Sequence, residues 1–127
     1  RNNFSQKFFY PIYGATQVIA DDFDQDGDID FAVTSFFPDY GPLIDESFVY
    51  LENTNSNKFR FKPYILKSEV PIKSLTMEEG DIDSDGDKDI ILGLFSHSPV
   101  PTPPGLQQKW DSSKNGLNIF FNQLHHR

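Results

Sequence analysis

The chain contains no cysteine and only one methionine, and none of its apolar runs approaches the length of a membrane span. The absence of cysteine excludes disulfides, thiolate metal sites and cysteine catalysis. Without a run of about 20 apolar residues, no membrane span is predicted. The opening residues, RNNFSQKFFY, lack the apolar centre of a signal peptide, so we expect mature or excised material.

Positive charge is also scarce. Eleven Lys and Arg residues stand against nineteen Asp and Glu residues, and the net charge of −8 argues against nucleic acid as a partner. The 127 residues suit one domain or a piece of one. Thirteen phenylalanines and a hydrophobic fraction of 37% exclude a disordered chain. Eight glycines and nine prolines recur between short apolar runs, which predicts an all-β fold.

The acidic residues are concentrated in two short segments, DFDQDGDID at residues 22–30 and DIDSDGDKD at residues 81–89. Both follow the spacing D-x-D-x-D-G-x-x-D and together they hold ten of the nineteen carboxylates. Like charges this close repel one another unless a counter-ion neutralises them. One divalent cation in each segment would bring the net charge from −8 to −4. The acidity therefore indicates metal binding rather than general solubility.

The similarity extends past the acidic segments, which are offset by 59 residues. A β-branched, apolar run follows each of them, DFAVTSFF in the first copy and DIILGLFS in the second. A polar loop with prolines then leads to SFVYLENT and to GLNIFFNQ, in which Asn53 and Asn122 take matching places. We therefore predict an internal repeat.

Eight strands and no helix are predicted: four strands in the first copy, three in the second and one upstream of both. Residues 96–116 contain four prolines and are expected to be neither strand nor helix interior. The predicted strands are Phe8–Tyr13, Gln17–Ala20, Asp30–Phe36, Phe48–Glu52, Phe59–Leu66, Leu75–Glu78, Asp89–Phe95 and Leu117–Phe121.

The spacing in the acidic segments suits a hard cation such as Ca²⁺, which takes six to eight oxygen ligands at about 2.3–2.6 Å. Positions 1, 3 and 5 offer carboxylates, the glycine at position 6 permits a sharp turn, position 7 offers its backbone carbonyl, and position 9 closes the site. Mg²⁺ is an alternative that demands stricter octahedral geometry. The absence of cysteine and the presence of only three histidines argue against zinc and copper.

Two other interpretations of these segments are less favoured. An EF-hand requires glutamate at position 12, where this chain has Val33 and Leu92. A solvated acidic turn without metal is the simpler alternative, but two copies at equivalent places in a repeat argue against it. All the ligands of each site would come from one loop, which leaves little open coordination for a substrate. We therefore expect a structural rather than a catalytic metal.

The segments VIADDFDQDGDIDFAVTSF…FVYLENTNSNKFRF and MEEGDIDSDGDKDIILGLF…GLNIFFNQ resemble the FG-GAP/VCBS repeat family of calcium-binding β-propeller blades. They are similar in kind to the calcium-bearing blades of integrin α-subunits. The Phe-Gly…Gly-Ala-Pro pattern is poorly kept, with Tyr13-Gly14 and Gly93 as partial matches, which favours the VCBS-type branch. The resemblance implies two Ca²⁺ sites with ligands at Asp22, Asp24, Asp26, Asp28, Asp30, Asp81, Asp83, Asp85, Asp87 and Asp89.

The resemblance also implies an organisation in blades. We expect two antiparallel four-stranded blades, offset by one strand, that form part of a larger propeller. Residues 4–13 would be the outer strand of a preceding blade, residues 14–67 the first blade, and residues 68–127 a second blade without its outer strand. The expected partners are then the remaining blades or other copies of the chain.

Three functions stay open at this point. The first is a non-catalytic module that binds glycan or protein at the cell surface, in the periplasm or outside the cell. The second is part of a propeller enzyme of lyase or hydrolase type that acts on polysaccharide, and the third is a structural spacer. A ligand would bind on the long loops at the rim opposite the acidic segments, where Tyr40, His97 and Trp110 are the candidates. Packing of Trp110 against its own blade is the alternative to ligand stacking.

Overall fold

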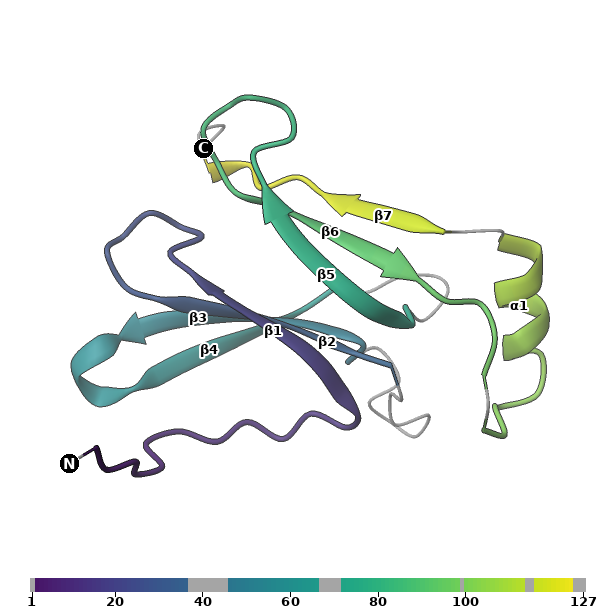
Figure 1. The fold of residues 1–127 in the computed structure, drawn as a ribbon, viewed down its shortest axis with the longest axis horizontal. Helices are drawn as coiled ribbons and strands as arrows, with labels where there is room; N and C mark the ends of the chain where they lie inside the picture. The colour runs from purple at the N-terminus through teal and green to yellow at the C-terminus, as the bar shows by residue number, and fades with distance from the viewer. Residues whose placement is uncertain (1, 37–45, 67–71, 99, 114–115, 125–127) are drawn as a thin grey trace.

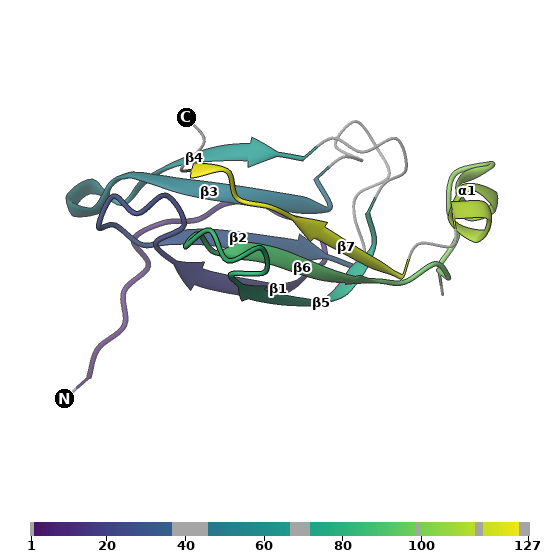
Figure 2. The same cartoon turned by 90° about the horizontal axis from the view of Figure 1, so that it is seen from above.

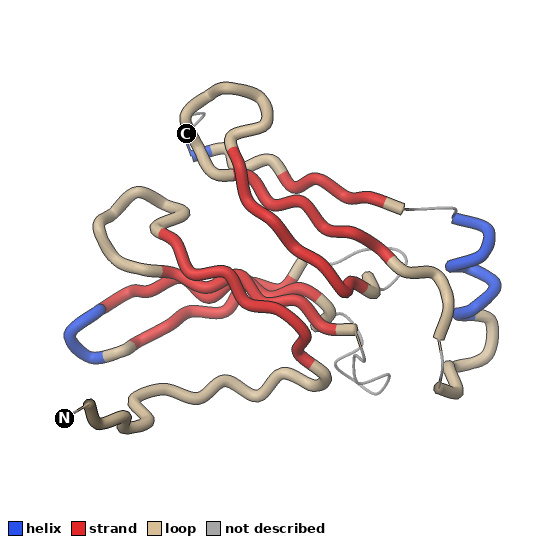
Figure 3. Tube along the Cα trace, in the orientation of Figure 1, coloured by secondary structure: helices blue, strands red, loops and turns tan. Residues whose placement is uncertain are grey.

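The computed structural model describes residues 2–36, 46–66, 72–98, 100–113 and 116–124. Within these ranges the chain is all-β, with two antiparallel sheets of four and three strands and one short α-helix (Figures 1 and 3). The elements are β1 Ala15–Asp21, β2 Asp30–Ser35, β3 Phe48–Asn55, the 3-10 turn Ser56–Lys58, β4 Arg60–Ile65, β5 Ser74–Gly80, β6 Asp89–Leu94, α1 Leu106–Ser113 and β7 Leu117–Phe120.

The first sheet is a simple meander in the order β1-β2-β3-β4. Its strands are rich in β-branched and aromatic residues, which suit a pleated, half-buried surface. The second sheet, in the order β5-β6-β7, repeats the first in register, because the pair Ile91–Ile119 takes the place of the pair Ala32–Tyr50. Both sheets also have the same shift of register near the start of their first strand. The predicted repeat is thus present in three dimensions, and seven of the eight predicted strands are confirmed.

The main core lies between the two sheets, where β1 and β5 run side by side (Figures 1 and 2). A double hydrogen bond joins these two strands. The side-chain amide of Gln17 donates to the Met77 carbonyl at 2.6 Å and accepts from the Met77 N–H at 2.7 Å. The buried residues of this core are Phe23, Ala32, Phe48, Ile72, Met77, Ile90 and Leu92.

The N-terminal segment lies along the far face of the first sheet (Figure 1). Tyr10 and Ile12 pack on the second, smaller core, and the Phe8 ring lies 4.5 Å from the Phe61 ring. The predicted strand Phe8–Tyr13 is wrong, because the segment is extended but has no strand beside it with which to form a ladder. Residues 4–13 form no ladder with either described sheet, and their assignment as the outer strand of a preceding blade stays a prediction.

The helix α1 is a second difference from the sequence prediction. All four prolines of residues 96–116 precede the helix, so none of them interrupts its hydrogen bonds. Gly105, with φ of 83°, makes the turn into it, and buried Leu106 and Trp110 hold it against the sheet end. Its eight residues are far too few to cross a membrane, and no other helix of the described ranges is long and apolar enough.

The meander places the functional loops at opposite ends of the sheets. The acidic connections β1–β2 and β5–β6 lie at one end, and α1 lies at the other (Figure 1). We call residues 22–30 Asp loop 1 and residues 81–89 Asp loop 2.

Candidate metal centres

Both Asp loops turn sharply through the left-handed region of backbone space. Gln25 and Gly27 of Asp loop 1 have φ of 59° and 96°, and Ser84 and Gly86 of Asp loop 2 have φ of 65° and 96°. Glycine at position 6 adopts this conformation without a steric cost. The two loops thus have the same winding at positions 4 and 6, as their common spacing predicts.

The backbone N–H groups of Asp loop 1 point at its own carboxylates. The Asp26 N–H donates to Asp22 Oδ1 at 3.0 Å and to Asp24 Oδ1 at 3.2 Å. The Gly27 N–H donates to Asp22 Oδ2 at 2.9 Å, and the Asp28 N–H to Asp26 Oδ1 at 2.9 Å. These bonds hold the carboxylates of positions 1 and 3 toward the inside of the loop.

Asp loop 2 has the same pattern. Asp81 accepts from the Asp85 N–H and from the Gly86 N–H, both at 3.1 Å. The Asp87 N–H donates to Asp85 Oδ1 at 2.9 Å. The arrangement is therefore a property of the motif rather than an accident of one loop.

Asp30, at position 9, closes Asp loop 1 from the inside. It is fully buried and accepts from the Phe23 N–H at 3.1 Å, the Tyr50 hydroxyl at 2.7 Å and the Asn53 N–H at 2.8 Å. Its carboxylate thus ties position 2 of the loop to strand β3. Since each carboxylate oxygen has two lone pairs, these bonds leave room for a cation.

Asp89 has the corresponding role in Asp loop 2. It is fully buried and accepts from the Ile82 N–H at 2.8 Å and from the Asn122 N–H at 2.9 Å. Position 9 is therefore the anchor of each loop in its own sheet.

In each loop, three carboxylates converge. One oxygen of each of Asp22, Asp24 and Asp30 lies within 4.8 Å of the others, and the same holds for the group Asp81, Asp83 and Asp89. Two oxygens that both lie about 2.4 Å from one ion can be at most about 4.8 Å apart, so the groups meet this condition for a shared Ca²⁺. The hard oxygen donors also fit a hard cation. Positions 5 and 7 lie outside these groups, and their ligand roles stay predictions.

Burial and like-charge repulsion in the clusters raise the pKa of two carboxylates. Burial, together with the charges of Asp30 and Asp26, raises the pKa of Asp24 to about 6. Desolvation and the charges of Asp85 and Asp89 raise the pKa of Asp83. A cation would relieve the like-charge part of this repulsion.

The two Asp loops also touch each other. Gln25 Nε2 donates to Asp87 Oδ1 at 3.1 Å and to the Gly86 carbonyl at 3.3 Å. Lys88 Nζ lies 4.0 Å from an Asp21 carboxylate oxygen, so a second contact crosses from one repeat to the other. The common spacing of the two loops does not predict this link. The only signal for it is that position 4 holds a long amide in one loop and a short serine in the other.

Position 7 also differs between the loops, because the Gln25 side chain contacts Asp87. Asp28 is half-buried, whereas Asp87 is fully buried and accepts from Gln25. The sequence predicts the same backbone role for both residues. The structure gives Asp87 an additional side-chain role.

The three residues predicted to bind a ligand on the long loops differ in their surroundings. Tyr40 lies outside the described residues. His97 is exposed, and its carbonyl accepts from Lys73 Nζ at 2.8 Å. Trp110 is only 4% exposed, and Lys73 Nζ lies over its ring. The burial of Trp110 favours the packing alternative, and ligand binding by the long loops stays a prediction.

Lys73 joins three segments at this end of the molecule, and no motif in the sequence predicts this role. It is only 2% exposed, and its Nζ lies 4.3 Å from the centre of the Phe36 ring and 5.3 Å from that of Trp110. Burial lowers the pKa of its ammonium. Lys73 thus fixes α1 and the loop before it to the first sheet.

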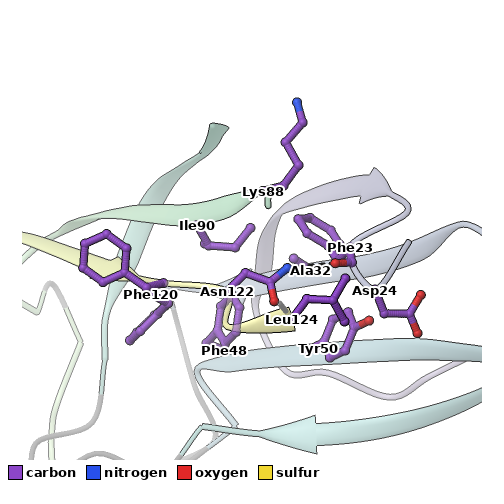
Figure 4. A pocket seen from close by; sticks show the side chains of 11 residues that line it. Phe23, Asp24, Ala32, Phe48, Tyr50, Lys88, Ile90, Phe120, Asn122 and Leu124 are labelled. Carbon is purple, nitrogen blue, oxygen red and sulfur yellow. Dashed lines mark hydrogen bonds between the residues drawn. The ribbon is translucent and has the colours of Figure 1, made fainter. Parts of the chain in front are cut away.

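A cavity of about 180 Å³ opens between the two sheets, next to Asp loop 1 (Figure 4). Its lining is mostly apolar and aromatic, with Asp24, Lys88 and Asn122 as polar members. The remaining lining residues are Phe23, Ala32, Phe48, Tyr50, Ile90, Phe120, Phe121 and Leu124.

Comparison with known families agrees with the geometry. A family model described as an FG-GAP-like repeat matches residues 22–92, which is more than half of the chain. The matched segment contains both Asp loops and runs from the start of Asp loop 1 into β6. No curated protein and no solved structure matches the chain. The predicted family is thus confirmed, and the VCBS-type branch stays a prediction.

Proposed function

The chain belongs to the FG-GAP-like repeat family, and on this premise we propose that it is a calcium-stabilised β-propeller-type module that acts by binding rather than by catalysis. One observation carries the proposal. The same three positions of two repeats bring their carboxylate oxygens within 4.8 Å of one another. A single acidic turn could arise without a metal, but the same convergence in two registered repeats supports a common ligand.

Calcium would supply charge neutralisation and a rigid centre to each loop. Asp22, Asp24 and Asp30 would hold one ion, and Asp81, Asp83 and Asp89 the other. The carboxylates at position 5 and the carbonyls at position 7 would complete the oxygen ligands that Ca²⁺ requires. With its ligands supplied by the protein, such a site stabilises the loop and leaves no open position for substrate.

We further propose that the binding surface is the rim opposite the Asp loops. The rigidity of this rim supports the proposal, because buried Trp110 and Lys73 hold α1 and the loop before it on the sheet end. Loops on a rigid scaffold are common sites of recognition. The partner would be a glycan or a protein.

The proposed location is outside the cytosol, at the cell surface, in the periplasm or in the medium. Calcium sites of extracellular modules have dissociation constants of about 0.1–1 mM, so they fill only where calcium is abundant. The family membership supports this location.

Calorimetric titration of the calcium-free chain tests the proposal. We expect two Ca²⁺ ions per chain and no comparable heat with K⁺. A glycan array with the calcium-loaded chain would then probe the partner, and incubation with acidic polysaccharides would test for products. Absence of calcium binding would overturn the proposed function, and product formation would replace binding by catalysis.

A further inference from the structure

Gln25 joins the ligand run of Asp loop 1 to that of Asp loop 2. It stands at position 4, between Asp24 and Asp26, and its Nε2 donates to Asp87 Oδ1 and to the Gly86 carbonyl. Resting on the proposed function, we infer that this link couples the two calcium sites, so that filling one site raises the affinity of the other.

The direction of the coupling follows from the order that each ion imposes. Gln25 has a left-handed backbone, with φ of 59°, and is flanked by carboxylates of Asp loop 1. With Asp24 held by an ion, this backbone and the position of the Gln25 amide would be fixed. The amide in turn holds Asp87 through its hydrogen bond to Oδ1, and Asp87 stands at position 7, where its carbonyl is predicted to bind the second ion. A loop that is already ordered loses less conformational entropy when it binds its own ion, and this gives positive cooperativity.

The second repeat provides a natural control. Ser84 occupies position 4 of Asp loop 2 and has nearly the same backbone, with φ of 65°, but its short side chain is exposed. Gln25→Ser therefore gives Asp loop 1 the residue that Asp loop 2 already has. It shortens the side chain without a change of charge or of the preferred winding. Ser84→Ala is the matched variant at a position that does not bridge the loops.

The structure also supplies a separate reporter for each site. The Gly27 N–H donates to Asp22 Oδ2 at 2.9 Å, and the Gly86 N–H donates to Asp81 Oδ2 at 3.1 Å. Each amide bonds a carboxylate of its own loop, so its NMR resonance is expected to move when that loop takes up calcium. A calcium titration followed by these two resonances resolves the two affinities.

The coupling is measured with a double-mutant cycle of wild type, Gln25→Ser, Asp24→Asn and the combined variant. With Asp24 present, Gln25→Ser should weaken calcium binding at the Gly86 reporter about fivefold or more, within the usual range of coupling between sites. With site 1 removed by Asp24→Asn, the same substitution should change this affinity less than about twofold. The cycle cancels the charge effects of each single variant. Because coupling between two sites is reciprocal, Gln25→Ser should weaken calcium binding at the Gly27 reporter by the same factor. This effect should be lost when Asp83→Asn removes site 2.

Each outcome decides between the coupling and its alternatives. Equal weakening with and without Asp24 would show that Gln25 merely supports Asp loop 2, and would overturn the coupling while leaving the proposed function intact. Independent titration of both reporters in wild type would do the same. Failure of both glycine resonances to respond to calcium, in a chain that retains its dispersed spectrum, would overturn the proposed function and the coupling together.

Discussion

Asn122 connects the end of the second sheet to Asp loop 1: its Nδ2 donates to the carbonyl of Phe23 at 2.8 Å, across 99 residues of sequence (Figure 4). Its repeat equivalent, Asn53, instead donates to the Ile29 carbonyl at 3.0 Å, within its own repeat. Asn53 thus stabilises the loop of its own repeat, whereas Asn122, at the equivalent position, joins the two repeats.

We predict that Asn122→Ala weakens the junction between the sheets. The substitution removes one hydrogen bond and leaves the Phe23 carbonyl without that donor, which costs about 1–2 kcal/mol of unfolding free energy. Urea denaturation of calcium-free protein measures it. Asn53→Ala is the control, because it should destabilise the first sheet without loosening the second one. Hydrogen exchange that increases only in the first sheet after Asn122→Ala would contradict this assignment.

We predict that the chain loses one calcium ion on Asp24→Asn and retains the other. The substitution removes a charged oxygen from a group of three that converge within 4.8 Å. Calorimetry should report one ion per chain, and Asp83→Asn should give the same stoichiometry from the other loop. Two ions retained in either variant would exclude position 3 as an essential ligand.

Substitutions at position 7 should have unequal effects on stability. Asp28→Ala removes a half-buried side chain and should cost less than about 1 kcal/mol, because only its carbonyl is expected to hold calcium. Asp87→Ala empties a buried position and removes the acceptor of Gln25, so it should cost about 1–3 kcal/mol. Thermal unfolding of the two variants without calcium compares them. Equal losses would mean that the buried contact contributes nothing.

Removal of calcium should lower the melting temperature of the chain reversibly. A ligand at a hundredfold excess over its dissociation constant contributes about 2.7 kcal/mol per site. Differential scanning calorimetry with chelator, and after calcium is returned, measures the change. Magnesium at the same concentration is the control, because its stricter octahedral geometry should give the smaller shift. A melting curve that is indifferent to chelator would contradict the metal assignment.

The contribution of Lys73 to stability should depend on pH. Burial lowers the pKa of its ammonium in the folded chain below the ordinary value of 10.5. At low pH both states hold the proton and the folded state bears the cost of the buried charge. As the pH rises from the folded pKa toward 10.5, the folded state releases the proton first, so wild type should gain stability relative to Lys73→Met. Urea denaturation at pH 7, 9 and 10 measures this difference. Lys109→Met, at an exposed lysine, is the matched control.

The local features of this protein could be predicted from its sequence. The winding of the Asp loops depends on residues within nine positions of each other, and so the glycine at position 6 and the alternating carboxylates were sufficient. The matching places of Asn53 and Asn122 likewise predicted the internal repeat, which the two sheets show as a common register.

Features that depend on distant partners could not be predicted. Phe8, Tyr10 and Ile12 alternate as in a strand and do face the sheet together, but a ladder needs a neighbouring strand edge, which the sequence does not reveal. The bond between Gln25 and Asp87 depends on how the two sheets pack. The helix around Trp110 was missed because the prolines before it dominated the composition of the whole segment.

The outer face of the second sheet gives the last prediction. In the first sheet, Phe23 and Phe48 are 6% and 8% exposed because they are covered by the second sheet. Their repeat equivalents in the second sheet, Ile82 and Leu117, are 39% and 60% exposed. Ile119, the equivalent of Tyr50, is 38% exposed. The same kind of apolar face is thus covered in one repeat and open in the next.

We expect this open face to pack against a further sheet, from another repeat or from another copy of the chain, because exposed apolar faces favour association. Because the exposed apolar residues lie on the face of the second sheet, the contact would join sheet faces. Sedimentation velocity on the isolated chain should therefore show association that rises with concentration. Leu117→Lys should weaken it, because a charge would be buried in the contact. Phe4→Lys is the control, since Phe4 is 99% exposed and lies in no sheet. A monomer at all concentrations, or equal effects of the two lysines, would mean that the outer face of the second sheet is stable in water without a partner.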